Sequence, residues 1–262
     1  MIFSGVDVGS LSADVVIMEN GGIIAYSVLP TGGDSIEAAY KAMEAALKKT
    51  TLTLKDITYT VATGYGRVNV PFAQENITEI SCHARGSHWL LPSTRTILDM
   101  GGQDCKAIRC DEQGRVTDFA MNEKCAAGTG RYLEIIAEVL EMSLNEIGPR
   151  SLEAKEEVGI SSACAVFARS EVLSLVRKGV PQNDVLGGVH EAIVRRVLAL
   201  INRVGVERDF VITGGIAKNT GVVYRLEKKM GFGTKIPTDP QIVGALGAAL
   251  FAEERFQSSG ST

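Results

Sequence analysis

Short apolar runs and longer segments of mixed polarity alternate along the chain. The short runs, several of which close in glycine turns, predict strands at 5–10, 13–18, 23–29, 57–62, 96–102, 106–110, 115–119 and 210–215. Segments with apolar residues at helical spacing predict helices at 34–47, 131–142, 165–177, 184–204, 222–230 and 241–253. Residues 257–262 are expected to form a frayed polar tail. Strands that alternate with helices in this order predict an α/β fold.

The opening pattern returns in the second part of the chain. Asp7-x-Gly9-Ser10 and Asp99-x-Gly101-Gly102 each close a predicted strand, lie 92 residues apart and precede a hairpin. A chance match is the alternative, because each motif is short. Since strand, acid, glycine and hairpin repeat in one order, we infer an internal duplication of a supersecondary unit.

Composition places the chain among ordinary globular proteins. Of its 262 residues, 45% are hydrophobic and 22% are charged, and the net charge of -4 argues against a nucleic-acid surface or an anionic membrane as partner. The sequence contains neither an apolar run of the roughly 20 residues that span a bilayer nor a recognisable signal peptide, so we expect a cytoplasmic location. The five cysteines show no paired spacing and do not predict a disulfide framework.

Three glycine turns are candidates for binding a nucleotide: Gly9-Ser10, Gly101-Gly102 and Gly214-Gly215. A tight turn after a buried strand exposes backbone N–H groups that bind phosphate oxygens. An ordinary β-turn is the alternative for each turn alone, but it explains the whole set less well. The third turn is expected on the ribose or adenine side, and Gly128-Thr129-Gly130 either touches phosphate or starts a helix. The sequence lacks a Gly-x-x-x-x-Gly-Lys-Ser/Thr motif, which disfavours the P-loop class.

Acidic residues beside these turns imply a cation. Asp7 and Asp99 stand at the ends of their strands, where carboxylates can lie beside a polyphosphate only if Mg²⁺ intervenes, through water ligands. Gln103 and Asp104 are candidates for orienting the attacking water. The sequence therefore predicts an ATP-hydrolysing protein.

Two cysteines precede predicted helices. Cys125 and Cys164 are surrounded by small residues, and a helix N-terminus stabilises a thiolate or a metal–sulfur cluster. For either cysteine alone, a buried thiol is the alternative. Because two cysteines cannot complete a four-cysteine site, we predict one [4Fe–4S] cluster between the subunits of a two-fold dimer. Cys82 is expected to be a packed thiol, and the three histidines, His83, His88 and His190, to be hydrogen-bonded or solvent-facing.

Six segments occur in the order of a known family. They are Asp7-x-Gly9-Ser10, Ala62-Thr63-Gly64-Tyr65-Gly66-Arg67, Glu79-Ile80-Ser81-Cys82-His83-Ala84, Asp99-x-Gly101-Gly102-Gln103-Asp104, Lys124-Cys125-Ala126-Ala127-Gly128-Thr129-Gly130-Arg131 and Gly244-Ala245-Leu246-Gly247-Ala248-Ala249-Leu250. Over nearly its whole length, the sequence resembles the activators (component A) of 2-hydroxyacyl-CoA dehydratases, within the benzoyl-CoA reductase/2-hydroxyglutaryl-CoA dehydratase ATPase-subunit family.

The resemblance implies two duplicated domains of the actin/Hsp70/acetate-kinase (ribonuclease H-like) type with a nucleotide cleft between them. The expected domains are 1–95 with 241–262, and 96–240. It further implies a homodimer bridged by one oxygen-sensitive [4Fe–4S] cluster on Cys125 and Cys164. Such proteins take an electron from ferredoxin or flavodoxin and use ATP hydrolysis to drive it onto a partner iron–sulfur dehydratase.

The expected site residues follow from the turns and the resemblance together. Asp7, Gln103 and Asp104 are expected to be catalytic. ATP or ADP is expected to bind at Gly9, Ser10, Asp99, Gly101, Gly102, Lys106, Gly128, Gly130, Gly214, Gly215 and Gly244. Two positions depart from the family pattern: Asp14 stands where family members usually have lysine, and Arg169 where they tend to have glutamate. Lys106 occupies the matching place in the second repeat and is expected to compensate for Asp14.

Other functions compatible with this fold remain as alternatives. The first is the ATPase subunit of a benzoyl-CoA reductase or another ATP-dependent iron–sulfur reductase. The second is a small-molecule kinase, which would have no use for Cys125 and Cys164. The third is an actin-like assembly protein, for which the chain is short.

Overall fold

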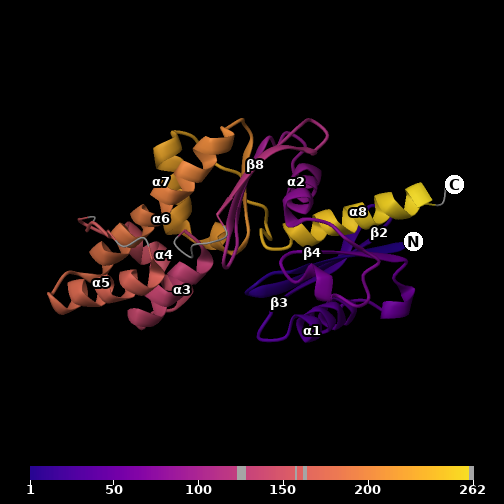
Figure 1. Ribbon diagram of the computed structural model, residues 1–262, viewed down its shortest axis with the longest axis horizontal. Helices are drawn as coiled ribbons and strands as arrows, with labels where there is room; N and C mark the ends of the chain where they lie inside the picture. Colours follow the sequence, from indigo (N-terminus) through magenta and orange to yellow (C-terminus); the bar gives the residue numbers. More distant parts are fainter. Residues whose placement is uncertain (123–127, 157, 162–163, 260–262) are drawn as a thin grey trace.

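Two mixed β-sheets, each with its own helices, form the two halves of the molecule (Figure 1). The computed structural model describes residues 1–122, 128–156, 158–161 and 164–259. The first half contains β1 (Ile2–Val8), β2 (Ser12–Glu19), β3 (Gly22–Pro30), α1 (Ser35–Leu47), β4 (Tyr59–Thr63), β5 (Glu75–Asn76), α2 (Glu79–Leu90) and α8 (Val243–Ser259). The second half contains β6 (Thr96–Met100), β7 (Cys105–Cys110), β8 (Val116–Asn122), α3 (Gly130–Val139), α4 (Leu144–Leu152), α5 (Ala165–Arg177), α6 (Gln182–Val204), β9 (Phe210–Thr213) and α7 (Thr220–Met230). Short 3-10 turns lie at Leu54–Asp56, Arg67–Asn69 and Gly215–Lys218.

The two sheets repeat one topology. The first has the strand order β3-β2-β1-β4-β5 and the second β8-β7-β6-β9. In each, a three-stranded antiparallel meander is joined by a strand parallel to its first member, β4 beside β1 and β9 beside β6. The duplicated sequence pattern therefore corresponds to a duplicated arrangement of strands.

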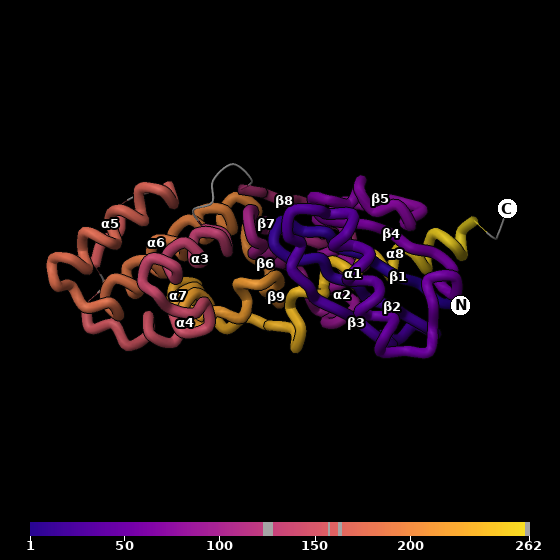
Figure 2. Tube along the Cα trace, turned by 90° about the horizontal axis from the view of Figure 1, so that it is seen from below, coloured from indigo at the N-terminus to yellow at the C-terminus, as the bar shows by residue number. Residues whose placement is uncertain are grey.

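Alternation of side chains along the strands gives the first sheet two apolar faces. Val15 and Ile17 of β2 pack with α1, whereas Val16 and Met18 of the same strand pack against α8. This two-residue period is the one that a strand covered on both faces requires. Figures 1 and 2 both show α8, the last helix of the chain, beside the strands of the first half rather than beside the second sheet that precedes it.

Helices α2 and α8 cross at very short range because glycines line the contact. A side-chain carbon added at Gly247 would lie 1.8 Å from the carbonyl oxygen of Cys82, and one added at Gly86 would lie 2.3 Å from that of Val243. Helix α2 also packs against the second sheet, where its Ala84 joins a small apolar cluster with residues of β6 and β7. Helix α2 therefore contacts both halves.

The elements differ from the predicted ranges at several places, among them β5 and α2, which are not in the predicted set, helix α4 and the C-terminal tail. Helix α4 was not predicted; it is short and contains Pro149, which interrupts a helical pattern. The predicted frayed tail at 257–262 is wrong for residues 257–259, which continue helix α8 to Ser259. There, the hydroxyl groups of Ser258 and Ser259 donate to the carbonyl oxygens four residues earlier, so polar side chains add to the helical bonds. The domain boundaries near 95 and 240 stay a prediction.

Candidate functional site

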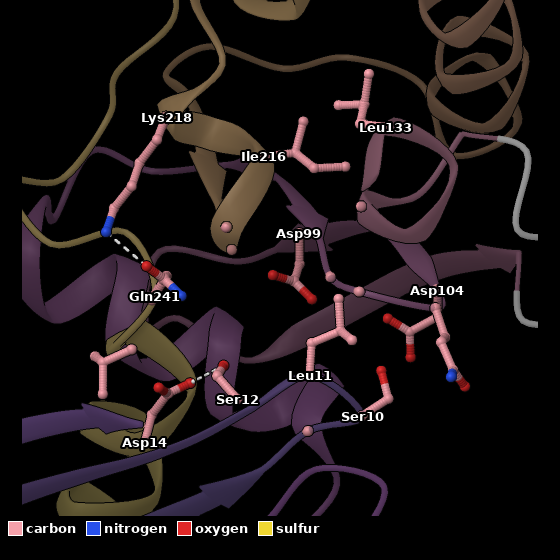
Figure 3. A pocket seen from close by; sticks show the side chains of 18 of the residues that line it. Ser10, Leu11, Ser12, Asp14, Asp99, Asp104, Leu133, Ile216, Lys218 and Gln241 are labelled. Carbon is pink, nitrogen blue, oxygen red and sulfur yellow. Dashed lines mark hydrogen bonds between the residues drawn. The ribbon is translucent and has the colours of Figure 1, made fainter. Parts of the chain in front are cut away.

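A cavity of about 840 Å³ opens between the two halves (Figure 3). Its walls come from the β1–β2 and β6–β7 turns, helices α2, α3 and α4, and the 3-10 turn after β9. The predicted residues that line it are Asp7, Gly9, Ser10, Asp99, Gly101, Gly102, Gln103, Asp104, Lys106, Gly130, Gly214 and Gly215. The fold thus brings together residues that lie more than a hundred positions apart in the sequence.

Two predicted nucleotide residues do not line this cavity. Gly128 is not among the lining residues, and a side-chain carbon added there would have as its nearest neighbour the Cβ of Arg196, at 3.8 Å; of the Gly128-Thr129-Gly130 turn, only Gly130, the first residue of α3, lines the cavity. Gly244 of α8 lies behind Asp7, because a carbon added there would approach the Asp7 Oδ2 atom to 2.1 Å. Gly244 therefore gives room to a site carboxylate instead of forming the wall.

The two phosphate-turn candidates have the same backbone bond. The Gly9 N–H donates to the Ser12 carbonyl at 2.8 Å, and the Gly101 N–H donates to the Asp104 carbonyl at 3.1 Å. The second turn is also tied to α3, whose first N–H group, at Gly130, donates to the Gly101 carbonyl at 2.9 Å. Both turns are tight, as the duplicated motif predicted, and one of them is joined directly to a helix.

Glycines at equivalent positions let the backbone pass the two aspartates. Gly64 follows β4 with a φ of 83°, and Gly214 follows β9 with a φ of 80°. An added side-chain carbon would lie 2.3 Å from the Asp7 Oδ1 atom at position 64, and 2.8 Å from the Asp99 Oδ1 atom at position 214. Positive φ and close approach together require glycine at both places.

His83, on α2, lies between the two aspartates. Its Nε2 atom is 3.5 Å from the Asp99 Oδ2 atom and 3.9 Å from the Asp7 Oδ2 atom. Its Nδ1 atom is 3.1 Å from the Thr213 hydroxyl, which donates to the Asp99 Oδ1 atom at 3.1 Å. The histidine is buried and hydrogen-bonded, as the sequence allowed. Its place in the site was missed, because no local spacing links a helical histidine to two strand ends.

Lys106 neutralises the second half of the site. Its Nζ atom is 2.8 Å from the Asp104 Oδ1 atom, 3.4 Å from the Asp99 Oδ2 atom and 4.0 Å from the Glu79 Oε1 atom. Burial lowers the pKa of Lys106, but the adjacent carboxylates outweigh it and hold that pKa above its usual value. For Asp99, burial raises the pKa, but the nearby His83 and Lys106 lower it by more. The pKa of Asp99 is therefore below its usual value.

The first half has a carboxylate where the second has this ammonium. Asp14 lies opposite Asp7 in the β1–β2 pair, as Lys106 lies opposite Asp99 in the β6–β7 pair. Burial, with the charge of Asp7 next, raises the pKa of Asp14 well above its usual value. Burial also raises the pKa of Asp7, to about 6. The two halves therefore share geometry but differ in charge.

Chemically, this arrangement suits a polyphosphate with a hard cation. Asp7 and Asp99 supply carboxylate oxygens, the ligands that Mg²⁺ prefers, and the buried Asp14 Oδ1 atom has no hydrogen-bond partner among the described residues. Apolar side chains from three elements also line the cavity, Leu133, Leu144 and Ile216, and such side chains can cover a flat aromatic base. Leu133 and Ile216 lie together at one side in Figure 3, away from Asp14.

Comparison with known proteins shows the family of the chain. The family model of the BadF/BadG/BcrA/BcrD ATPases matches residues 4–252. The chain belongs to this ATPase family. The activator of lactoyl-CoA dehydratase from Anaerotignum propionicum is 47% identical over 254 residues, which cover 97% of this chain and 98% of that protein.

Solved structures give the same result for the fold. The activator of the 2-hydroxyisocaproyl-CoA dehydratase from Clostridium difficile, with bound ADPNP, has a TM-score of 0.93 and 41% identity, and the match covers 100% of this chain and 98% of that one. A ROK family glucokinase from Streptomyces griseus, with 13% identity, a TM-score of 0.58 and coverage of 97% and 100%, is similar in fold alone. The expected family and the actin-like fold class are confirmed.

The four cysteines in the described part of the chain fall into two environments. Cys82, Cys105 and Cys110 are buried, and burial raises the pKa of each thiol, that of Cys110 to about 11. Cys164 is exposed and forms the N-cap of α5. Cys125 lies outside the described residues.

The described part of the chain has neither a three-residue metal site nor a membrane-spanning helix. Among the described residues, no group of three or more histidine, cysteine, aspartate or glutamate side chains is placed to hold a metal ion. In the same residues, no helix has both the length and the apolar character needed to cross a bilayer.

Proposed function

We propose that this ATPase is an activator of a 2-hydroxyacyl-CoA dehydratase that acts in the cytoplasm. In the proposal, two copies of the chain bind one [4Fe–4S] cluster through Cys125 and Cys164 and pass single electrons to the partner enzyme. Ferredoxin or flavodoxin supplies these electrons, and each transfer is coupled to hydrolysis of ATP. Support comes from the similarity to two named dehydratase activators, one of them solved with an ATP analogue.

The cavity has the groups that ATP hydrolysis needs. Backbone N–H groups in the turns that contain Gly9-Ser10 and Gly101-Gly102 would bind the phosphates, and Asp7 and Asp99 would hold Mg²⁺ through its water ligands. Gln103 and Asp104, which follow Gly101-Gly102 in the sequence and line the cavity, orient the attacking water. A water attacks the terminal phosphorus, the bond to ADP breaks, and phosphate leaves. All these roles are part of the proposal.

One observation carries the link between hydrolysis and the cysteines. The first two N–H groups of helix α3, at Gly130 and Arg131, donate to the carbonyl oxygens of Gly101 and Gly102 at 2.9 and 2.8 Å. Residues 101 and 102 form the phosphate-turn candidate, and Cys125 precedes α3 in the sequence. A shift of this turn on loss of a phosphate therefore pulls on the start of the helix that follows Cys125.

The other cysteine lies on a surface suited to a second chain. Cys164 is exposed at the N-terminus of α5, and the positive end of a helix dipole favours a bound anionic group. Val166 and Phe167, in the first turn of α5, are 67% and 69% exposed, which leaves apolar area beside the thiol for a partner to cover. When bound there, an iron–sulfur cluster would accept one electron from the donor and release it to the dehydratase.

Iron content and cysteine variants test the cluster. Protein purified without oxygen is expected to be brown and to hold about two irons per chain, that is, four per dimer. Cys164→Ser is expected to lose the iron and the colour, while Cys110→Ser, which changes a buried thiol of the second half, keeps both. About four irons per chain, or full iron content in Cys164→Ser, would contradict the shared cluster.

Reconstitution tests the partner. With a reduced ferredoxin or flavodoxin and a 2-hydroxyacyl-CoA dehydratase, dehydration is expected only when ATP is present, and it is lost with Cys164→Ser although ATP turnover remains. Activation of a benzoyl-CoA reductase but of no dehydratase would favour the reductase alternative. ADP formation that depends on a phosphate-accepting small molecule would show a kinase instead.

A further inference from the structure

Charge breaks the internal symmetry of the cavity. In the second half, the Lys106 ammonium lies opposite Asp99, with 3.4 Å between its Nζ atom and the Asp99 Oδ2 atom. In the first half, the residue opposite Asp7 is Asp14. Directly opposed side chains of an antiparallel pair have Cβ atoms roughly 4.5–5.5 Å apart, and like charges at that distance repel. A cation is therefore present in one half and missing at the equivalent place in the other.

The position of Asp14 suits the binding of a cation. It is 5% exposed and lines the cavity, where Figure 3 shows it beside Ser12. Its Oδ2 atom accepts a hydrogen bond from the Ser12 hydroxyl at 3.0 Å, but its Oδ1 atom has no hydrogen-bond partner among the described residues. Such a buried oxygen is costly unless a bound group completes it.

The basic side chains that line the cavity already have other partners. Lys106 contacts Asp99 and Asp104, and His83 lies between Asp99 and Asp7. Lys218, from the second half, donates to the Gln241 side chain at 2.5 Å, the bond drawn in Figure 3. Within the described part of the chain, no side chain forms an ion pair with Asp14.

We propose that Asp14 and Asp7 together bind a second divalent cation, Mg²⁺ or Mn²⁺, in the nucleotide cavity. Carboxylate oxygens are the ligands such ions prefer, and waters and phosphate oxygens complete the coordination. Asp7 is then shared between this ion and the one that it holds with Asp99, an arrangement found in two-metal phosphate sites. The second ion supplies the charge that Lys106 supplies in the other half. The inference rests on the proposed placement of the nucleotide.

Counting bound Mn²⁺ by electron paramagnetic resonance tests the site. In saturating ADP, which is not hydrolysed, the full chain is expected to bind two Mn²⁺, and Asp14→Lys one, because its ammonium replaces the second ion. Without nucleotide, Asp14→Asn is expected to bind Mn²⁺ at least ~10-fold more weakly than the unaltered protein. Glu19→Lys is the matched control, since Glu19 is an exposed acid on the same strand.

Three results would overturn the second site. They are one Mn²⁺ with ADP in the unaltered protein, two in Asp14→Lys, or equal nucleotide-free affinity in Asp14→Asn. ADP affinity is measured as well. If Lys218→Met lowers it as much as Asp14→Asn does, the positive charge opposite Asp7 comes from Lys218 and not from a second ion. If the unaltered chain binds Mn²⁺ at Asp14 but no ADP, the proposed ATPase site fails while the cation site stands. Melting curves of both Asp14 variants check that they fold.

Discussion

The buried ammonium of Lys106 should be one of the main electrostatic supports of the second half, and Lys106→Met tests this. Methionine keeps the length of the stem but removes the charge. The substitution leaves Asp99, whose side chain is 4% exposed, without the ammonium 3.4 Å away. Removing one partner of such a buried pair costs about 3–5 kcal/mol. The other two carboxylates add little, because Asp104 is 28% exposed and Glu79 keeps its ion pair with Arg67.

Urea unfolding without nucleotide measures this loss. The fluorescence of Trp89, the single tryptophan, reports the transition from α2, the helix that contacts both halves. For a chain of this size, the expected loss lowers the melting temperature by roughly 6–20 °C. Lys106→Met with Asp99→Asn should recover most of it, because the unpaired charge is gone. A loss below about 1 kcal/mol, or a double variant no more stable than Lys106→Met, would refute the reasoning.

Three further predictions follow from buried positions. Burial lowers the pKa of His190 from 6.5 to about 4. The free energy of unfolding should therefore be at its full value above pH 6.5 and fall by up to about 3 kcal/mol as the pH drops towards 4, because the unfolded chain binds the proton first. Urea unfolding of His190→Gln should show a flatter pH dependence. Gly244→Ala places a carbon 2.1 Å from the Asp7 Oδ2 atom and should lower steady-state ATP turnover ~100-fold by displacing that carboxylate. Gly247→Ala meets the Cys82 carbonyl at 1.8 Å and should destabilise the α2–α8 contact by about 1–3 kcal/mol in thermal unfolding.

Matched changes separate these effects from general damage. Gly33→Ala adds a carbon that meets nothing within 4 Å and should leave turnover and melting temperature unchanged. Full turnover in Gly244→Ala would show that Asp7 does not depend on that space. An unaltered melting temperature in Gly247→Ala would mean that the helices separate at little cost, and the same pH profile in His190→Gln would assign the dependence to another group.

Strand ends and tight turns were predictable because their signals are local. Asp7 and Asp99 follow apolar runs and precede glycine, and this short pattern was enough to infer that the hairpin unit is duplicated. The same comparison drew attention to Asp14 and Lys106, which the structure places at equivalent register positions. Periodicity also located most helices to within a few residues.

The rest of the site depends on contacts that no local pattern contains. His83 reaches Asp99 only because glycines allow α2 to pack closely on α8 while Ala84 contacts the second sheet. Helix α4 lines the cavity, but Pro149 hides its helical period. These are tertiary effects, and they decide which of the predicted residues share one cavity.

The position of His83 also gives the protein a spectroscopic reporter of its own. One ring nitrogen faces an aspartate from each sheet, at 3.5 Å and 3.9 Å, so any movement of one half against the other changes the electric field at the imidazole. The chain has only three histidines, and a histidine-labelled sample therefore gives few resonances to assign. The imidazole signal of His83 would follow the opening of the molecule through a turnover without an added probe.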